Sequence, residues 1–160
     1  MKRKIFIMTA LVMMIFCVNA CAFTDVQNGS WYYDNVTDMT NQGYLSGYED
    51  GTFRPDGTVT KAELVSIVGR IAGLQESAKQ NNHWADGMVQ TALTKGLFDW
   101  DEIPPTAQTY DEPITRQLAV KIVMNAFFKE ERGDYNRVSS SVSDFEQLDG
   151  RYYDSMISAY

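Results

Sequence analysis

Residues 43–63 read Gly-Tyr-Leu-Ser-Gly-Tyr-Glu-Asp-Gly-Thr-Phe-Arg-Pro-Asp-Gly-Thr-Val-Thr-Lys-Ala-Glu. Asp50-Gly51 and Asp56-Gly57 are typical turn dipeptides, because Asp hydrogen-bonds its own backbone and Gly tolerates positive φ. Pro55 between them keeps this segment out of a helix or a central strand. The stretch therefore predicts a glycine-rich loop that leads directly into a helix.

The helix start at the end of this stretch has the sequence of a capping box. In such a box the Thr60 hydroxyl accepts from the Glu63 amide, while the Glu63 carboxylate accepts from the Thr60 amide. Lys61 falls in the first turn, where the macrodipole disfavours a cation by about 0.3–1 kcal/mol. An ammonium beside free helix amides also forms an anion site. A solvated surface lysine is the alternative interpretation.

The first 22 residues have the pattern of an export signal. Residues 1–4 are basic, residues 5–18 are apolar, and residues 20–22 form a small-residue cleavage sequence. We expect a signal peptide over 1–22 and no membrane segment after its cleavage. A lipoprotein signal that uses Cys21 as the lipidated residue is the alternative.

Composition excludes several kinds of site. Both cysteines, Cys17 and Cys21, lie in the predicted signal, so the mature chain is expected to have no disulfide and no cysteine nucleophile or ligand. His83 is the only histidine, which leaves no usual zinc site or Ser-His dyad, and we expect it at the surface or at a boundary between units. No cofactor or metal is predicted. The formal charge of −7 argues against nucleic acid as a partner.

Beyond the signal, the sequence repeats. Residues 31–43 and 84–96 each run from Trp to Gly with a helical apolar pattern, and the glycine ends the helix. The capped helix start recurs, with residues 59–63 aligning to residues 114–118 without a gap. The expected core residues of the two second helices are Leu64, Ile67, Val68 and Ile71 in the first copy, and Leu118, Ile122, Val123 and Ala126 in the second.

A third copy begins near the end of the chain. Residues 142–144 match residues 23–25, and residues 152–154 match residues 32–34. The sequence stops at Tyr160, before a third loop or a third cationic helix start. We therefore expect a truncated third repeat.

This arrangement resembles the S-layer homology (SLH) domain of bacterial surface proteins. The first repeat matches nearly throughout, and the second matches mainly around its Trp, its Gly and its helix start. The residues that carry the resemblance are Phe23–Val26, Trp31, Gly43, Gly47–Pro55 and Val59–Glu63, followed by Trp84, Gly96, Ile114, Thr115 and Arg116.

The resemblance implies an all-α fold of tandem helix–loop–helix repeats around a pseudo-threefold axis. The expected divisions are repeat 1 at 23–74, repeat 2 at 75–131, and a linker with the start of repeat 3 at 132–160. Two departures stand out. Lys61 replaces the usual arginine, and Gln117 and Leu118 replace the usual Ala-Glu, so the second helix lacks a capping box.

The resemblance also implies a non-enzymatic, secreted protein of the cell wall or S-layer. Its partner would be secondary cell-wall polysaccharide, anionic and often pyruvylated, bound between repeats. The expected glycan-binding residues are the cations Lys61 and Arg116, the aromatic residues Trp31 and Trp84, and Thr60 and Thr115. For the tryptophans a role as core anchors is the alternative.

Two other functions compete with glycan binding. One is a structural module that packs with other SLH-bearing chains and binds no glycan. The other is a wall-lytic enzyme that works through carboxylates alone, although no pair of acids stands out by its position.

Overall fold

The computed structural model describes residues 23–128 and 133–159, so the predicted signal peptide at 1–22 lies outside the described residues. In this described part the secondary structure is helical and contains no strand, with one isolated antiparallel bridge between Thr60 and Pro113. The predicted all-α class is confirmed. No helix in the same two ranges has the length and apolarity needed to cross a membrane.

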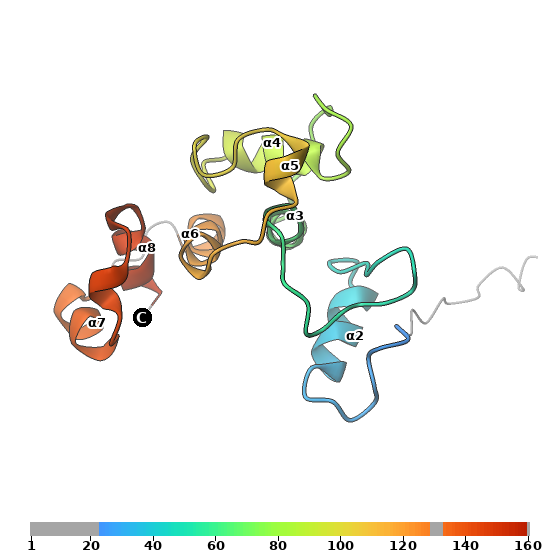
Figure 1. Ribbon diagram of the computed structural model, residues 1–160, viewed down its shortest axis with the longest axis horizontal. Helices are drawn as coiled ribbons and strands as arrows, with labels where there is room; N and C mark the ends of the chain where they lie inside the picture. Colours follow the sequence, from blue (N-terminus) through green and yellow to red (C-terminus); the bar gives the residue numbers. More distant parts are fainter. Residues whose placement is uncertain (1–22, 129–132, 160) are drawn as a thin grey trace, which may run out of the picture. The chain divides into compact units, whose positions relative to one another are not determined.

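The chain forms two compact units that meet in sequence between Pro55 and Asp56. The predicted first repeat is therefore shared between them. The first unit contains helix α2, Tyr33–Asn41, and the loop that follows it (Figure 1). Its N-terminal segment is joined to that loop because the Asp25 carboxylate accepts the Phe53 and Arg54 amides at 2.8 and 2.7 Å.

The predicted turn at Asp50-Gly51 is confirmed. Asp50 Oδ1 accepts from the Thr52 amide at 3.0 Å and from its hydroxyl at 2.6 Å, and Gly51 has φ +78°. The Arg54 guanidinium pairs with Asp50 at 2.8 Å and lies over the Tyr48 ring at 4.0 Å. The Thr52 hydroxyl, followed by Arg54, lowers the pKa of Asp50 to about 2. This carboxylate is thus used to build the loop.

The second unit contains the remaining elements. They are α3 Lys61–Ile71, α4 Asp86–Thr94, α5 Ala107–Tyr110, α6 Arg116–Phe127, α7 Tyr135–Ser141, the 3₁₀ turns η1 Phe145–Gln147 and η2 Gly150–Tyr152, and α8 Tyr153–Ser158. Helix α3 contacts α4, α5 and α6, and α6 in turn contacts η2 and α8 (Figure 1). Two short helices, α5 and α7, were not anticipated from the sequence.

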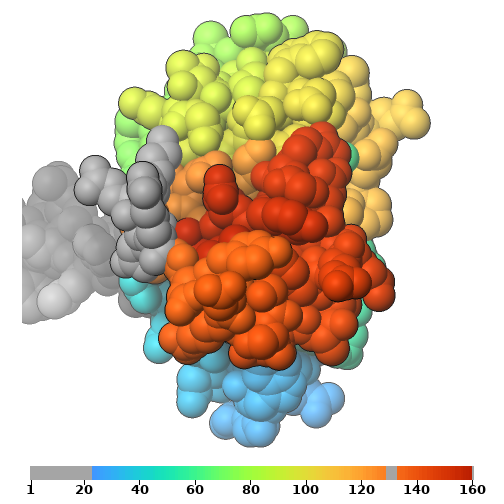
Figure 2. Space-filling view, turned by 90° about the vertical axis from the view of Figure 1, so that its left-hand side faces the viewer, coloured from blue at the N-terminus to red at the C-terminus, as the bar shows by residue number. Residues whose placement is uncertain are grey.

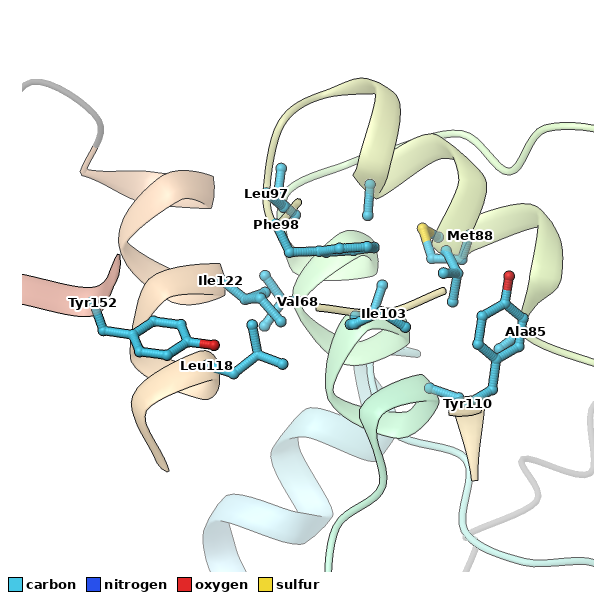
Figure 3. Close-up of a cluster of buried hydrophobic side chains, with 14 residues drawn as sticks. Val68, Ala85, Met88, Leu97, Phe98, Ile103, Tyr110, Leu118, Ile122 and Tyr152 are labelled. Atoms are coloured by element: carbon cyan, nitrogen blue, oxygen red, sulfur yellow. The ribbon is translucent and has the colours of Figure 1, made fainter. Parts of the chain in front are cut away.

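One apolar core joins the two repeats and the C-terminal segment within this unit. Figure 3 shows side chains from α3, α4, α5 and α6 converging, with the Tyr152 ring entering from the far side of α6. The fully buried large members include Tyr110, Phe98, Met88, Ile103 and Ile122.

The predicted core stripe of α6 is largely correct, and that of α3 is correct for the buried Val68 and for Leu64, which packs against the core, but wrong for Ile71. Leu118 and Ile122 of α6 are buried, but the buried face of α3 is lined by Ala62, Val65, Ser66, Val68 and Gly69. Ile71 is exposed. Close packing explains the choice, because a Cβ on Gly69 would collide with the buried Met88 side chain of α4. Small residues therefore mark the face of α3 that meets α4.

The backbone repeats where the sequence does. The residues before α2, α4 and α8 (Tyr32, Ala85 and Tyr152) all adopt helical φ/ψ rather than the usual extended cap conformation. Gly43 and Gly96 both follow their helices with positive φ, +77° and +72°, as predicted.

The C-terminal segment packs on the second repeat. Figure 2 shows it (red) directly beside the loop of that repeat (yellow). Arg151 pairs there with Asp101 at 3.2 Å. The Asp149 amide also donates to Gln117 Oε1 of α6 at 3.3 Å. The C-terminal segment thus covers part of α6.

Candidate functional site: an edge formed by two helix starts

Both predicted helix starts are capped by threonine. Thr60 Oγ1 accepts from the Glu63 amide at 3.2 Å, and the Thr60 amide donates to Glu63 Oε2 at 2.8 Å, which completes the predicted box. Thr115 Oγ1 accepts from the Leu118 amide at 3.3 Å without a reciprocal bond, as Leu118 in place of Glu requires. Each cap uses the oxygen as acceptor, so each hydroxyl proton remains available to another acceptor.

The segments that precede the two helices are joined by main-chain hydrogen bonds. The Lys61 amide donates to the Glu112 carbonyl at 2.9 Å, and the Ile114 amide donates to the Val59 carbonyl at 3.0 Å. These bonds flank the bridge between Thr60 and Pro113. Helices α3 and α6, which begin with the equivalent Thr-Lys and Thr-Arg sequences, are therefore preceded by two segments that pair with each other through their main chains. We call residues 59–61, 83–84 and 111–116 the helix-start edge.

The two cations of this edge are in different environments. Lys61 Nζ pairs with Glu112 Oε2 at 2.9 Å, and its side chain is only 14% exposed. Arg116 is exposed and takes part in none of the ion pairs found within residues 23–128 and 133–159. One positive charge is thus neutralised by the protein itself, and the other is open to a ligand.

Trp84 is connected to the same edge through His83. The Ala85 amide donates to His83 Nδ1 at 3.2 Å, so His83 Nε2 carries the proton and donates to Asp111 Oδ1 at 3.1 Å. The His83 and Trp84 rings lie 5.5 Å apart. The His83 side chain is only 8% exposed, so of the two positions expected for it, the surface or a boundary between units, the surface one is wrong. The neighbouring Trp84 is 49% exposed.

Trp31 belongs to the first unit, where it is 88% exposed and meets Tyr32 edge-on at 5.4 Å. The alternative that the two tryptophans are core anchors is therefore contradicted, since both present a large aromatic surface to solvent. Main-chain bonds around the Thr60–Pro113 bridge place the segments that precede the two helices side by side. Trp84 is linked to them through Asp111.

Sequence reasoning missed the two acids of the edge. Asp111 and Glu112 come directly before the Pro113-Ile114-Thr115 helix start. This acidic pair was the available signal, but its target, Lys61, is 51 residues away from Glu112. Local pattern alone does not reveal such a partner.

Residues 22–65 match the S-layer homology domain. The chain contains an S-layer homology domain. This SLH chain is 30% identical over 142 residues to an endoglucanase of Bacillus sp. (strain KSM-635), a match that covers 81% of the chain and 15% of the enzyme. It is 28% identical over 91 residues to a cellulosome-anchoring protein of Acetivibrio thermocellus, covering 50% of the chain and 20% of that protein. It is 31% identical over 88 residues to a surface layer protein of Brevibacillus choshinensis, covering 46% of the chain and 8% of that protein.

The SLH chain thus spans a fifth or less of the length of these relatives. The SLH domain is a binding module, and in the endoglucanase the matched part is a small share of the enzyme. The family match and the surface-protein relatives confirm the predicted location at the bacterial cell surface.

Proposed function

We propose that this SLH chain anchors to the cell wall non-covalently by binding an anionic secondary cell-wall polysaccharide, with pyruvyl carboxylates as the recognised groups. The observation that carries the proposal is the exposed Arg116 at the capped start of α6, which forms no ion pair within the described part of the chain. The relatives named as cellulosome-anchoring and surface layer proteins support the general role.

Arg116 is the principal ligand-binding residue in this proposal. A guanidinium offers a planar pair of N–H donors that matches a carboxylate bidentately, and it stays charged at all relevant pH values. Its position in the first turn of α6 adds the partial positive charge of the helix N-terminus, which also favours an anion.

The other predicted residues have supporting roles. Lys61 is the second cation of the edge, although Glu112 balances its charge, and Thr60 and Thr115 offer hydroxyl protons to sugar or carboxylate oxygens. The exposed faces of Trp84 and, in the first unit, Trp31 provide apolar surfaces on which a sugar ring stacks.

The test is binding of purified wall polysaccharide, with and without its pyruvyl groups, to wild type and to Arg116→Ala. Arg137→Ala is the matched control, because Arg137 is also exposed and lies on helix α7. We expect Arg116→Ala to weaken binding at least tenfold, as for loss of a charge-assisted bidentate contact. Arg137→Ala should bind as wild type does, and removal of pyruvyl groups should abolish the difference between the variants.

Equal binding by wild type and Arg116→Ala contradicts the assigned site. If the polysaccharide does not bind at all while the chain associates with other SLH-bearing chains, the structural function is correct instead. Release of sugar or peptide fragments from purified walls would instead establish that the chain is a wall-lytic enzyme.

A further inference from the structure

Lys61 and Arg116 hold equivalent positions in the two repeats, but their electrostatic environments differ because Glu112 pairs with Lys61. Its carboxylate lies 2.9 Å from Lys61 Nζ, where an acidic ligand group would otherwise bind. Arg116, at the equivalent position of the second repeat, meets no such acid in the described residues.

The ion pair between Lys61 and Glu112 is supported by a main-chain hydrogen bond as well as by the attraction of its charges. The main chains of Lys61 and Glu112 are hydrogen-bonded to each other, so both side chains start from fixed, adjacent positions. Little conformational freedom is lost when their charged ends meet. The Lys61 side chain is mostly buried and requires a counter-charge, whereas Glu112 is 49% exposed and free to swing away.

We propose that Glu112 is an internal competitor for Lys61 and thereby sets the specificity of the helix-start edge. A ligand carboxylate reaches Lys61 only by displacing the Glu112 carboxylate, an exchange between like groups that yields little affinity. The site therefore binds primarily through Arg116, and Lys61 is engaged only by a ligand whose other contacts drive Glu112 away. This inference rests on the proposed function of the same site.

The first experiment needs no ligand. The rate at which an amine-acylating reagent modifies Lys61, measured by peptide mass spectrometry, is compared between wild type and Glu112→Gln. We expect several-fold faster modification in Glu112→Gln, because the ammonium loses its partner while the main-chain bonds of residue 112 remain. Glu146→Gln removes an exposed acid elsewhere and should leave the rate unchanged. An unchanged rate in Glu112→Gln overturns the proposal.

The second experiment measures affinity for pyruvylated wall polysaccharide by calorimetry. We expect Glu112→Gln to bind about three- to tenfold more tightly than wild type. Glu146→Gln, which changes the net charge equally, should not. Adding Lys61→Met to Glu112→Gln should remove the gain, and thermal unfolding of each variant verifies that it is folded.

The outcomes separate the two proposals. If Arg116→Ala weakens binding but folded Glu112→Gln binds as wild type does, the competitor role is wrong and the proposed function stands. If neither wild type nor any variant binds the polysaccharide, the proposed function is wrong, and the acylation rates alone decide whether Glu112 shields Lys61.

Discussion

Tyr110 donates its hydroxyl proton to Asp86 Oδ1 over 2.8 Å in the interior of the second unit. Asp86 is fully buried at the start of α4, and it also accepts from the Gln80 and Asn81 amides and from the Asn81 side chain. Burial, followed by the contact with Asp86, raises the pKa of Tyr110 to about 12. The bond joins α5 to α4, and it holds Tyr110 directly before Asp111 and Glu112 of the helix-start edge.

Removing this hydroxyl should destabilise the fold. We expect Tyr110→Phe to lower the free energy of unfolding by about 1–2 kcal/mol, because a buried carboxylate loses one of its donors. Urea denaturation gives the value. Tyr135→Phe, in which the tyrosine is half exposed, is the control and should change stability by less than about 0.5 kcal/mol. Similar values for both variants would show that the hydrogen bond contributes nothing.

Asp86 should make stability depend on acid pH. Burial raises its pKa, but the hydrogen bonds from the Gln80 amide, the Tyr110 hydroxyl and the Asn81 amide outweigh burial, so its pKa lies below the ordinary 3.8. A carboxyl whose pKa is lower in the folded state stabilises the protein above the unfolded pKa, and this contribution is lost as the pH falls through the folded one.

The unfolding free energy of wild type should therefore fall between about pH 5 and about pH 2, and that of Asp86→Asn should fall less steeply. Urea titrations at a series of pH values measure both slopes. Asp34→Asn, which changes an exposed first-turn acid of α2, should keep the wild-type slope. Parallel curves for wild type and Asp86→Asn would assign the acid sensitivity to other carboxyls.

The threonine caps should contribute to stability through their hydroxyl oxygens. We expect Thr115→Ala to lower the free energy of unfolding by about 1 kcal/mol, because the Leu118 amide loses its acceptor. Thr115→Ser keeps that acceptor and should cost little. The same comparison applies at Thr60. Thermal or urea unfolding of the four variants tests this, and a serine variant as unstable as its alanine counterpart would point to lost methyl packing instead.

The exposed tryptophans should affect binding more than folding. We expect Trp84→Ala to weaken binding of wall polysaccharide about two- to tenfold through loss of a stacking surface. Trp31→Ala should act similarly if the first unit also contacts the glycan. Trp100→Ala is the control, since Trp100 is also largely exposed but lies outside the helix-start edge. Equal losses in all three variants would indicate nonspecific apolar adsorption.

Features set by neighbouring residues were predictable from the sequence. The Thr60–Glu63 box, the lone Thr115 cap, the Asp50 turn and the helix ends at Gly43 and Gly96 all depend on contacts within a few residues. Composition and spacing carry that information directly, which is why these predictions are confirmed.

Features set by distant contacts were not predictable. The buried face of α3 depends on where α4 lies, so the small Gly69, and not Ile71, faces the core. The state of Lys61 depends on Glu112, and the burial of His83 depends on Asp111 and Tyr110. Helix α7, capped by Asp134, lies in a segment whose sequence matches neither repeat.

The bridge between Thr60 and Pro113 also has a mechanical consequence. It closes the chain segment 61–112, which contains α3, α4 and α5, and the two main-chain bonds beside it connect residues 59–61 directly to residues 112–114. A pull applied between residues 58 and 117 is therefore transmitted across the bridge and bypasses that segment. Rupture of the bridge and of the core that α3, α4 and α5 share with α6 would release about 170 Å of extended chain. A surface protein under shear would thus hold a reserve of length behind two hydrogen bonds and this packed core.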